Sequence, residues 1–229
     1  MKRLNVFGKL AVLTLMLVAS ATHAEVVKYD FTAHGTSVNY GGGAPADFPG
    51  SAASAYLPVG STLSGSFFYD TTLNAVFTGP NYNDFYSSTG IGITLTSSAG
   101  YHFANNVTTE FGQPSAHVDD SNPEDLLRVA GTEIDSHGAS NDVTLTLTGK
   151  GTQVLTTSAL PHALSLNDFN GVVDIYWTDG AGKEFSYKAE IDTLTVAAAV
   201  PEPETYAMLL AGLALVGVAR RRKQGQASA

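Results

Sequence analysis

The chain has 229 residues, no cysteine and a net charge of −9. Its body, residues 25–200, holds all but two of the 21 acidic residues and few of the 12 basic ones, so the net charge of the body is about −14. Nucleic acids and anionic membrane surfaces are poor partners for such a charge. The lack of cysteine excludes disulfides, thiol nucleophiles and thiolate metal sites.

Residues 1–24 predict a secretory signal peptide. Basic residues at positions 2, 3 and 9 precede an apolar stretch over residues 10–19, and small residues end the segment at Thr22-His23-Ala24. This order is that of a cleavable export signal. An uncleaved anchor is the alternative, but the apolar stretch is shorter than the ~20 residues of a spanning helix. We expect cleavage after Ala24, with a second site at Ala19-Ser20-Ala21.

Residues 25–196 predict a single antiparallel β-sandwich. Apolar and polar residues alternate in short segments separated by Gly, Asn, Asp, Pro and Ser, which indicates strands with one buried and one wet face. The residues expected to face inward are Val27, Tyr29 and Phe31; Leu63, Phe67 and Tyr69; Ile91, Ile93 and Leu95; Val143, Leu145 and Leu147; and Phe185, Tyr187, Ala189 and Ile191. We predict an all-β, jelly-roll-like fold of about eight to ten strands in two layers.

Two segments, residues 39–58 and 78–89, predict long loops because they are rich in Gly, Asn and Tyr. The second carries Tyr82, Phe85 and Tyr86, whose rings could stack on sugars. Trp177, at a strand end, is expected in the core or at the rim of the sandwich.

The densest acidic segment offers oxygen ligands that could fold around Ca²⁺, namely Asp119, Asp120, Asn122 and Asp125. The segment lacks the glycine and terminal glutamate of an EF-hand loop. A solvated loop that caps a helical turn over residues 123–128 explains the same residues. We favour that interpretation and predict no metal or cofactor, with Ca²⁺ as the alternative.

A hairpin is predicted between residues 172–177 and 184–192. The apolar residues then change parity, from Ile191 to Leu194 and Val196. Because a slip of one residue inverts every side chain of a strand, this change predicts a bulge or a new strand near Asp192-Thr193.

The C-terminal segment has three parts. Pro201-Glu202-Pro203 leads into an apolar run over residues 205–219, and the run ends at a basic cluster, Arg220, Arg221, Arg222 and Lys223. The prolines keep the chain extended, the run can enter a bilayer, and the basic cluster stays on the cytoplasmic side. As a helix the run is about 22 Å long, against a hydrocarbon core of roughly 30 Å, so it suits a transient anchor. A helix packed on the domain is the alternative, but the run has no polar face.

This order of parts resembles the PEP-CTERM sorting signal of Gram-negative bacteria, and Pro201-Glu202-Pro203 matches the motif of that family letter for letter. The resemblance covers residues 200–223. It implies an exported protein, held transiently in the inner membrane and processed by an exosortase, in an organism that makes exopolysaccharide. The expected organisation is a signal peptide (1–24), a β-sandwich (25–196) and a sorting signal (197–229).

We therefore expect a non-enzymatic protein of the cell envelope or extracellular matrix, with a structural or adhesive role and exopolysaccharide as the candidate ligand. A secreted hydrolase acting on matrix polysaccharide is the alternative. The chain has no Gly-x-Ser-x-Gly, His-Glu-x-x-His or phosphate-loop motif, which argues against it. Two carboxylates facing each other in a deep cleft would favour it.

Overall fold

The computed structural model describes residues 26–41, 57–105, 113–121, 125–134, 139–151, 154–178 and 184–197. These residues form eleven strands and no helix. The strands are β1 (Val26–Gly41), β2 (Thr62–Asp70), β3 (Phe77–Thr78), β4 (Tyr82–Tyr86), β5 (Ile91–Ser97), β6 (His102–Ala104), β7 (Ser115–Asp119), β8 (Leu126–Ile134), β9 (Ser140–Gly149), β10 (Phe169–Thr178) and β11 (Glu184–Val196). The predicted signal peptide lies outside the described residues.

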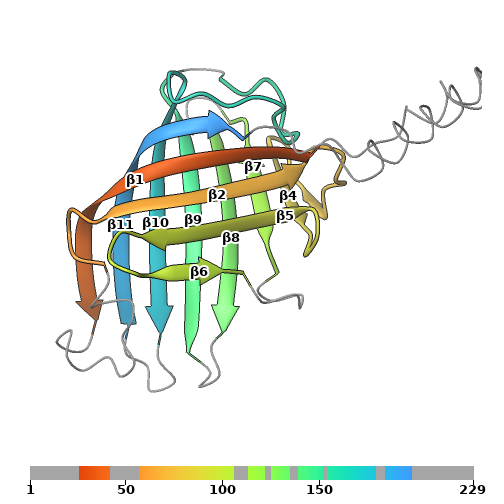
Figure 1. Cartoon of the computed structure of the whole chain (residues 1–229). Helices are drawn as coiled ribbons and strands as arrows, with labels where there is room; N and C mark the ends of the chain where they lie inside the picture. Colours follow the sequence, from red (N-terminus) through yellow and green to blue (C-terminus); the bar gives the residue numbers. More distant parts are fainter. Residues whose placement is uncertain are drawn as a thin grey trace, which may run out of the picture. The chain divides into compact units, whose positions relative to one another are not determined.

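The strands form one antiparallel sheet with the order β3-β4-β7-β8-β9-β10-β11-β1-β2-β5-β6. Figure 1 shows β2, β5 and β6 crossing in front of β8, β9 and β10, so the sheet curls over itself into a front and a back layer. Across the core, β5 contacts β7 and β8. The prediction of an all-β, sandwich-like fold is confirmed, and the two layers prove to belong to one continuous sheet.

The first and last strands belong to both layers. In the front layer β1 pairs with β2 over residues 26–34, whereas β11 pairs with β10 of the back layer only over residues 184–190. Between β1 and β11 the register shifts twice, skipping Thr36 on one strand and Asp192 on the other. Bulges bend a strand and increase its twist, which lets one strand turn from one layer into the next. The irregularity predicted near Asp192-Thr193 is confirmed as a bulge.

The core follows the predicted alternation. Of the predicted inward residues, Val27 and Ile191 are half-buried and the others are buried. Tyr29 stacks on Phe67 with ring centroids 5.3 Å apart, and Trp177 is half-buried against this core. Fully burying a large apolar side chain contributes about 1.5–3 kcal/mol, so the alternating residues supply the main driving force for this fold.

Three local predictions were wrong. The helical turn expected over residues 123–128 is not formed in its described part, because residues 126–128 belong to β8, which pairs with both β7 and β9. Residues 39–41, expected in a loop, continue β1 and pair with residues 184–186. The loop expected over residues 78–89 contains β4, which pairs with β7. In each case ladder hydrogen bonds to distant strands outweigh the local preference for a turn or loop.

The predicted hairpin near the C-terminus is confirmed. β10 and β11 pair in antiparallel register from Thr178 and Glu184 to Val172 and Glu190. The turn between them lies outside the described residues. Beyond Val172 and Glu190 the two strands part, since β11 turns toward the front layer.

Candidate functional site

A groove lies where β10 and β11 part, and we call it the corner groove. Its volume is about 480 Å³, within the range of small-molecule sites. Buried Phe169 and half-buried Ile191 lie at its floor. Exposed Lys150, Asn170, Glu190 and Asp192 also line it.

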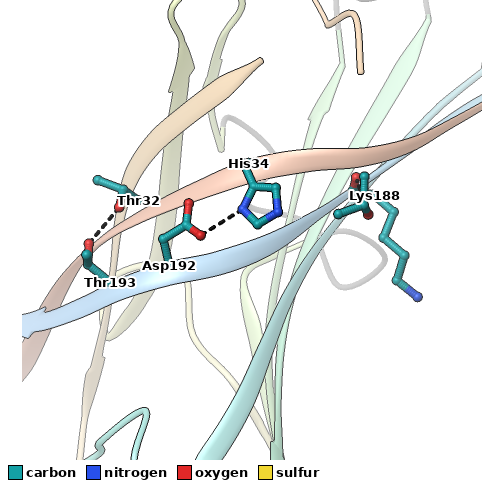
Figure 2. Close-up of polar contacts among 6 residues, drawn as sticks. Thr32, His34, Lys188, Asp192 and Thr193 are labelled. Carbon is teal, nitrogen blue, oxygen red and sulfur yellow. Dashed lines mark hydrogen bonds and ion pairs between the residues drawn. The ribbon is translucent and has the colours of Figure 1, made fainter. Parts of the chain in front are cut away.

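The bulge places polar side chains beside this groove. His34 Nδ1 lies 2.7 Å from Asp192 Oδ1, and the Thr32 and Thr193 hydroxyl oxygens are 2.7 Å apart. Figure 2 shows both contacts bridging β1 and β11. The side chains of His34 and Asp192 are 48% and 46% exposed. Solvent therefore weakens this contact, which directs one oxygen of the Asp192 carboxylate toward His34.

A second group of residues lies at the far edge of the back layer, and we call it the aromatic edge. It consists of Phe77, Tyr82 and Tyr86, which are 60%, 39% and 36% exposed. Phe77 and Tyr86 meet edge to face with ring centroids 6.3 Å apart. Tyr82 and Tyr86 stand on the same face of β4, about 14 Å apart at the rise of a strand.

Polar groups adjoin the aromatic edge. His117 Nδ1 lies 2.6 Å from Asp84 Oδ1, and both side chains are half-buried. The ring of Tyr82 lies 5.7 Å from that of His117. Arg128, exposed on β8, pairs in register with His117. The edge thus combines aromatic faces with hydrogen-bond donors and acceptors.

Sequence reasoning identified only part of this edge. Tyr82 and Tyr86 are exposed, as the hypothesis of sugar stacking requires, whereas Phe85 is buried at 3% exposure. The pairs of Asp84 with His117 and of His34 with Asp192 were missed because their members lie 33 and 158 residues apart. The change of parity after Ile191 was the one signal that pointed toward Asp192.

The acidic segment does not behave as one solvated loop. Asp119 Oδ1 accepts the Ser121 N–H at 2.8 Å in a local turn. Asp125 is 0% exposed, and its Oδ2 accepts the Leu155 N–H at 2.7 Å. Asp120 is half-buried, and Asn122 lies outside the described residues. Among the described residues, no group of three or more His, Asp or Glu side chains could hold a metal ion.

The predicted sorting residues Pro201, Glu202 and Pro203 lie outside the described part of the chain, as do Arg220, Arg221, Arg222 and Lys223. So does the apolar segment over residues 205–219. No helix in the described ranges is long and apolar enough to cross a membrane.

Comparison with known families resolves the C-terminal segment. Residues 199–223 match the PEP-CTERM protein-sorting motif. The chain carries a PEP-CTERM sorting motif. A protein with this motif is exported, is held transiently in the membrane and is sorted by an exosortase. No curated protein and no solved structure matches the chain.

Proposed function

We propose that the β-sandwich is a non-enzymatic polysaccharide-binding module with an adhesive or structural role in the cell envelope or extracellular matrix. The aromatic edge carries this proposal. Monomeric soluble proteins bury most of their large aromatic rings, so three exposed rings at one sheet edge favour a binding surface. The sorting motif supports the proposal, because it delivers the protein to the side of the membrane where such polymers lie.

The chemistry of the edge suits a polysaccharide. A pyranose ring presents C–H groups on its faces and hydroxyls around its rim, so Tyr82 and Tyr86 would stack on the faces of separate sugar units along one chain. Asp84 and His117 would accept or donate hydrogen bonds to the hydroxyls, and Arg128 would donate several in a fixed geometry. The three rings are exposed at the edge of the sheet, which lets a long polymer pass across them.

A hydrolase is less well supported. Glycoside hydrolysis uses two carboxylates that flank the bond being broken. In the corner groove, Glu190 and Asp192 come from the same strand, and Asp192 contacts His34. Two carboxylates on one wall suit the binding of a donor group better than attack from opposite sides.

The test is affinity electrophoresis of the detergent-solubilised full chain in gels that contain β-glucan, galactomannan or the exopolysaccharide of the producing bacterium. We expect at least one polysaccharide to retard the protein. A Tyr82→Ala/Tyr86→Ala variant should bind roughly tenfold more weakly or worse, since each aromatic contact contributes about 0.5–1.5 kcal/mol. Tyr176→Ala is the matched control, because Tyr176 is an equally exposed tyrosine on β10.

Retardation that is equal for the wild type and the double variant would show that the aromatic edge is not the binding surface. If none of the polysaccharides retards the wild-type protein, the proposal itself is wrong. Circular dichroism of each variant establishes that the β-sheet is retained.

A further inference from the structure

We propose that the corner groove is a second binding site, separate from the aromatic edge, for a hydroxyl-rich ligand that carries an amino group, such as an amino sugar. The groove exists because of the bulge at Asp192. Up to Val172 and Glu190 the strands β10 and β11 are hydrogen-bonded neighbours. Beyond this pair β11 turns into the front layer, and the gap it leaves in the back layer is about 480 Å³ in volume.

The floor of the groove is apolar. Leu166, Val172 and Ile191 are half-buried and line the groove together with Phe169, of which only 2% is exposed. Ile191 packs directly against Gly171, which has no side chain; a Cβ at position 171 would lie 2.7 Å from Ile191 Cδ1. Such a floor can pack against the C–H face of a sugar ring, which removes apolar surface from water on both sides.

The rim of the groove is polar and its charges are arranged asymmetrically. Glu190 and Asp192 stand on the β11 wall, where each exposes a carboxylate. Lys150 follows the last residue of β9, and its Nζ donates a hydrogen bond to the Leu166 carbonyl. Lys150 is therefore held by a backbone oxygen, and no contact between it and either carboxylate is found in the described part of the chain.

Asp192 has a hydrogen-bond partner before any ligand arrives. Its Oδ1 contacts His34 Nδ1 at 2.7 Å, which leaves Oδ2 to accept another hydrogen bond. A group that is already oriented loses less entropy when it binds a ligand. Figure 2 shows this contact spanning the two strands at the bulge.

The charges select the ligand. Two carboxylates on one wall of the groove favour an ammonium group, because charge-assisted hydrogen bonds are about twice as strong as neutral ones. The net charge of about −14 on the body repels anionic sugars. The Asn170 amide and the remaining Lys150 donors are placed to bind hydroxyls. An amino sugar combines the required ammonium, hydroxyls and apolar ring face.

The test is isothermal titration of the detergent-solubilised full chain with glucosamine, glucose and glucuronic acid. We expect a Kd for glucosamine on the order of 1 mM, as befits a ligand of this size. Glucose, which has a hydroxyl in place of the amine, should bind at least tenfold more weakly, and glucuronic acid more weakly still. Added salt should weaken glucosamine binding, because the partners are charged.

Three variants locate the site. Glu190→Gln and Asp192→Asn should each lower glucosamine affinity about three- to tenfold. Asp174→Asn is the matched control, since Asp174 is an exposed carboxylate on β10 that does not line the groove. It should bind glucosamine like the wild type, and all three variants should keep the melting temperature of the wild type.

Equal affinity for glucosamine and glucose would overturn the assignment of the ligand class. Unchanged glucosamine binding in both Glu190→Gln and Asp192→Asn, or loss of binding in Tyr82→Ala/Tyr86→Ala, would place the ligand elsewhere and overturn the site. Absence of glucosamine binding to the wild type also refutes the inference. Loss of binding in Tyr82→Ala/Tyr86→Ala would assign the sugar to the aromatic edge instead, whereas the other results leave polysaccharide retention at that edge untouched, so the two proposals fail separately.

Discussion

Replacing Asp125 by alanine should destabilise the sandwich although the residue lies at the start of a strand. The Asp125 side chain is 0% exposed, and its Oδ2 accepts the Leu155 N–H at 2.7 Å. Its backbone oxygen accepts the Gly149 N–H at 2.8 Å. Asp125 thereby joins the start of β8, the end of β9 and the segment that follows β9. The alanine variant keeps the backbone contact and loses only the side-chain one.

The expected loss of stability follows from the hydrogen-bond donor that loses its acceptor. The Leu155 N–H is buried and would lose its acceptor, which costs about 1–3 kcal/mol. We therefore expect Asp125→Ala to lower the free energy of unfolding by about 2 kcal/mol, or roughly 4–8 °C in melting temperature for a domain of this size. Asp125→Asn keeps one oxygen acceptor and removes a buried carboxylate that has a second, unpartnered oxygen. It should stay within about 1 kcal/mol of the wild type.

Urea unfolding monitored by the fluorescence of Trp177, the single tryptophan of the chain, measures these changes. Asp119→Ala is the control, because the half-buried Asp119 accepts the N–H of nearby Ser121 in a local turn. It should cost about 0.5–1 kcal/mol. If Asp125→Ala and Asp119→Ala unfold at the same urea concentration, the buried acceptor does not contribute as argued here.

Three further outcomes are expected. Gly65→Ala should cost about 1–3 kcal/mol in urea unfolding, because its Cβ would lie 2.4 Å from the Thr94 carbonyl oxygen. Gly151→Ala should be nearly neutral, because its Cβ would meet no atom of the described residues within 4 Å apart from its chain neighbours; equal midpoints would contradict this. Burial raises the pKa of Tyr69 and Tyr101 above 10, so these tyrosines ionise in the unfolded chain at a lower pH than in the folded protein. The free energy of unfolding should therefore be unchanged below pH 10 and fall above it, by up to about 1.4 kcal/mol per pH unit for each tyrosine. Urea midpoints that stay constant between pH 9 and 11 would refute that reading. In an exosortase-containing host, Glu202→Ala should leave membrane insertion intact and block processing, which fractionation with a tag after the signal peptide detects; normal release would show that the motif is not read at this glutamate.

The predictions that held depend on patterns within one segment. The alternation in Ile91, Ile93 and Leu95 indicates which face of the strand is apolar. That face is buried wherever the strand lies in the fold, because apolar side chains are driven out of water. The same alternation located the bulge. The apolar positions change from odd to even numbers after Ile191, and such a change needs one extra residue in the strand, which is Asp192. The sorting motif is likewise read from contiguous residues, and it matches over residues 199–223.

The predictions that failed depend on neighbours that are distant in the chain. Pro123 and the acids beside it favour a helical turn locally, but β7 and β9 offer Leu126 and Leu127 ladder partners on both sides. β4 is too polar to show a strong strand pattern, yet it pairs with β7. The local sequence predicts a solvated Asp125, whereas in the fold its side chain accepts a hydrogen bond from Leu155, which lies 30 residues away in the chain. Pairing with distant strands stabilises these segments more than their local conformational preferences destabilise them.

For this protein, the sequence by itself determined which side chains avoid water and which C-terminal residues address the chain to the membrane, because both are properties of short contiguous segments. Only the tertiary structure decided which polar residues meet. The contact of His34 with Asp192 and the gap between β10 and β11 both arise where the first and last strands change layer together. That turn depends on how the whole sheet closes over its core, and no single segment contains the information.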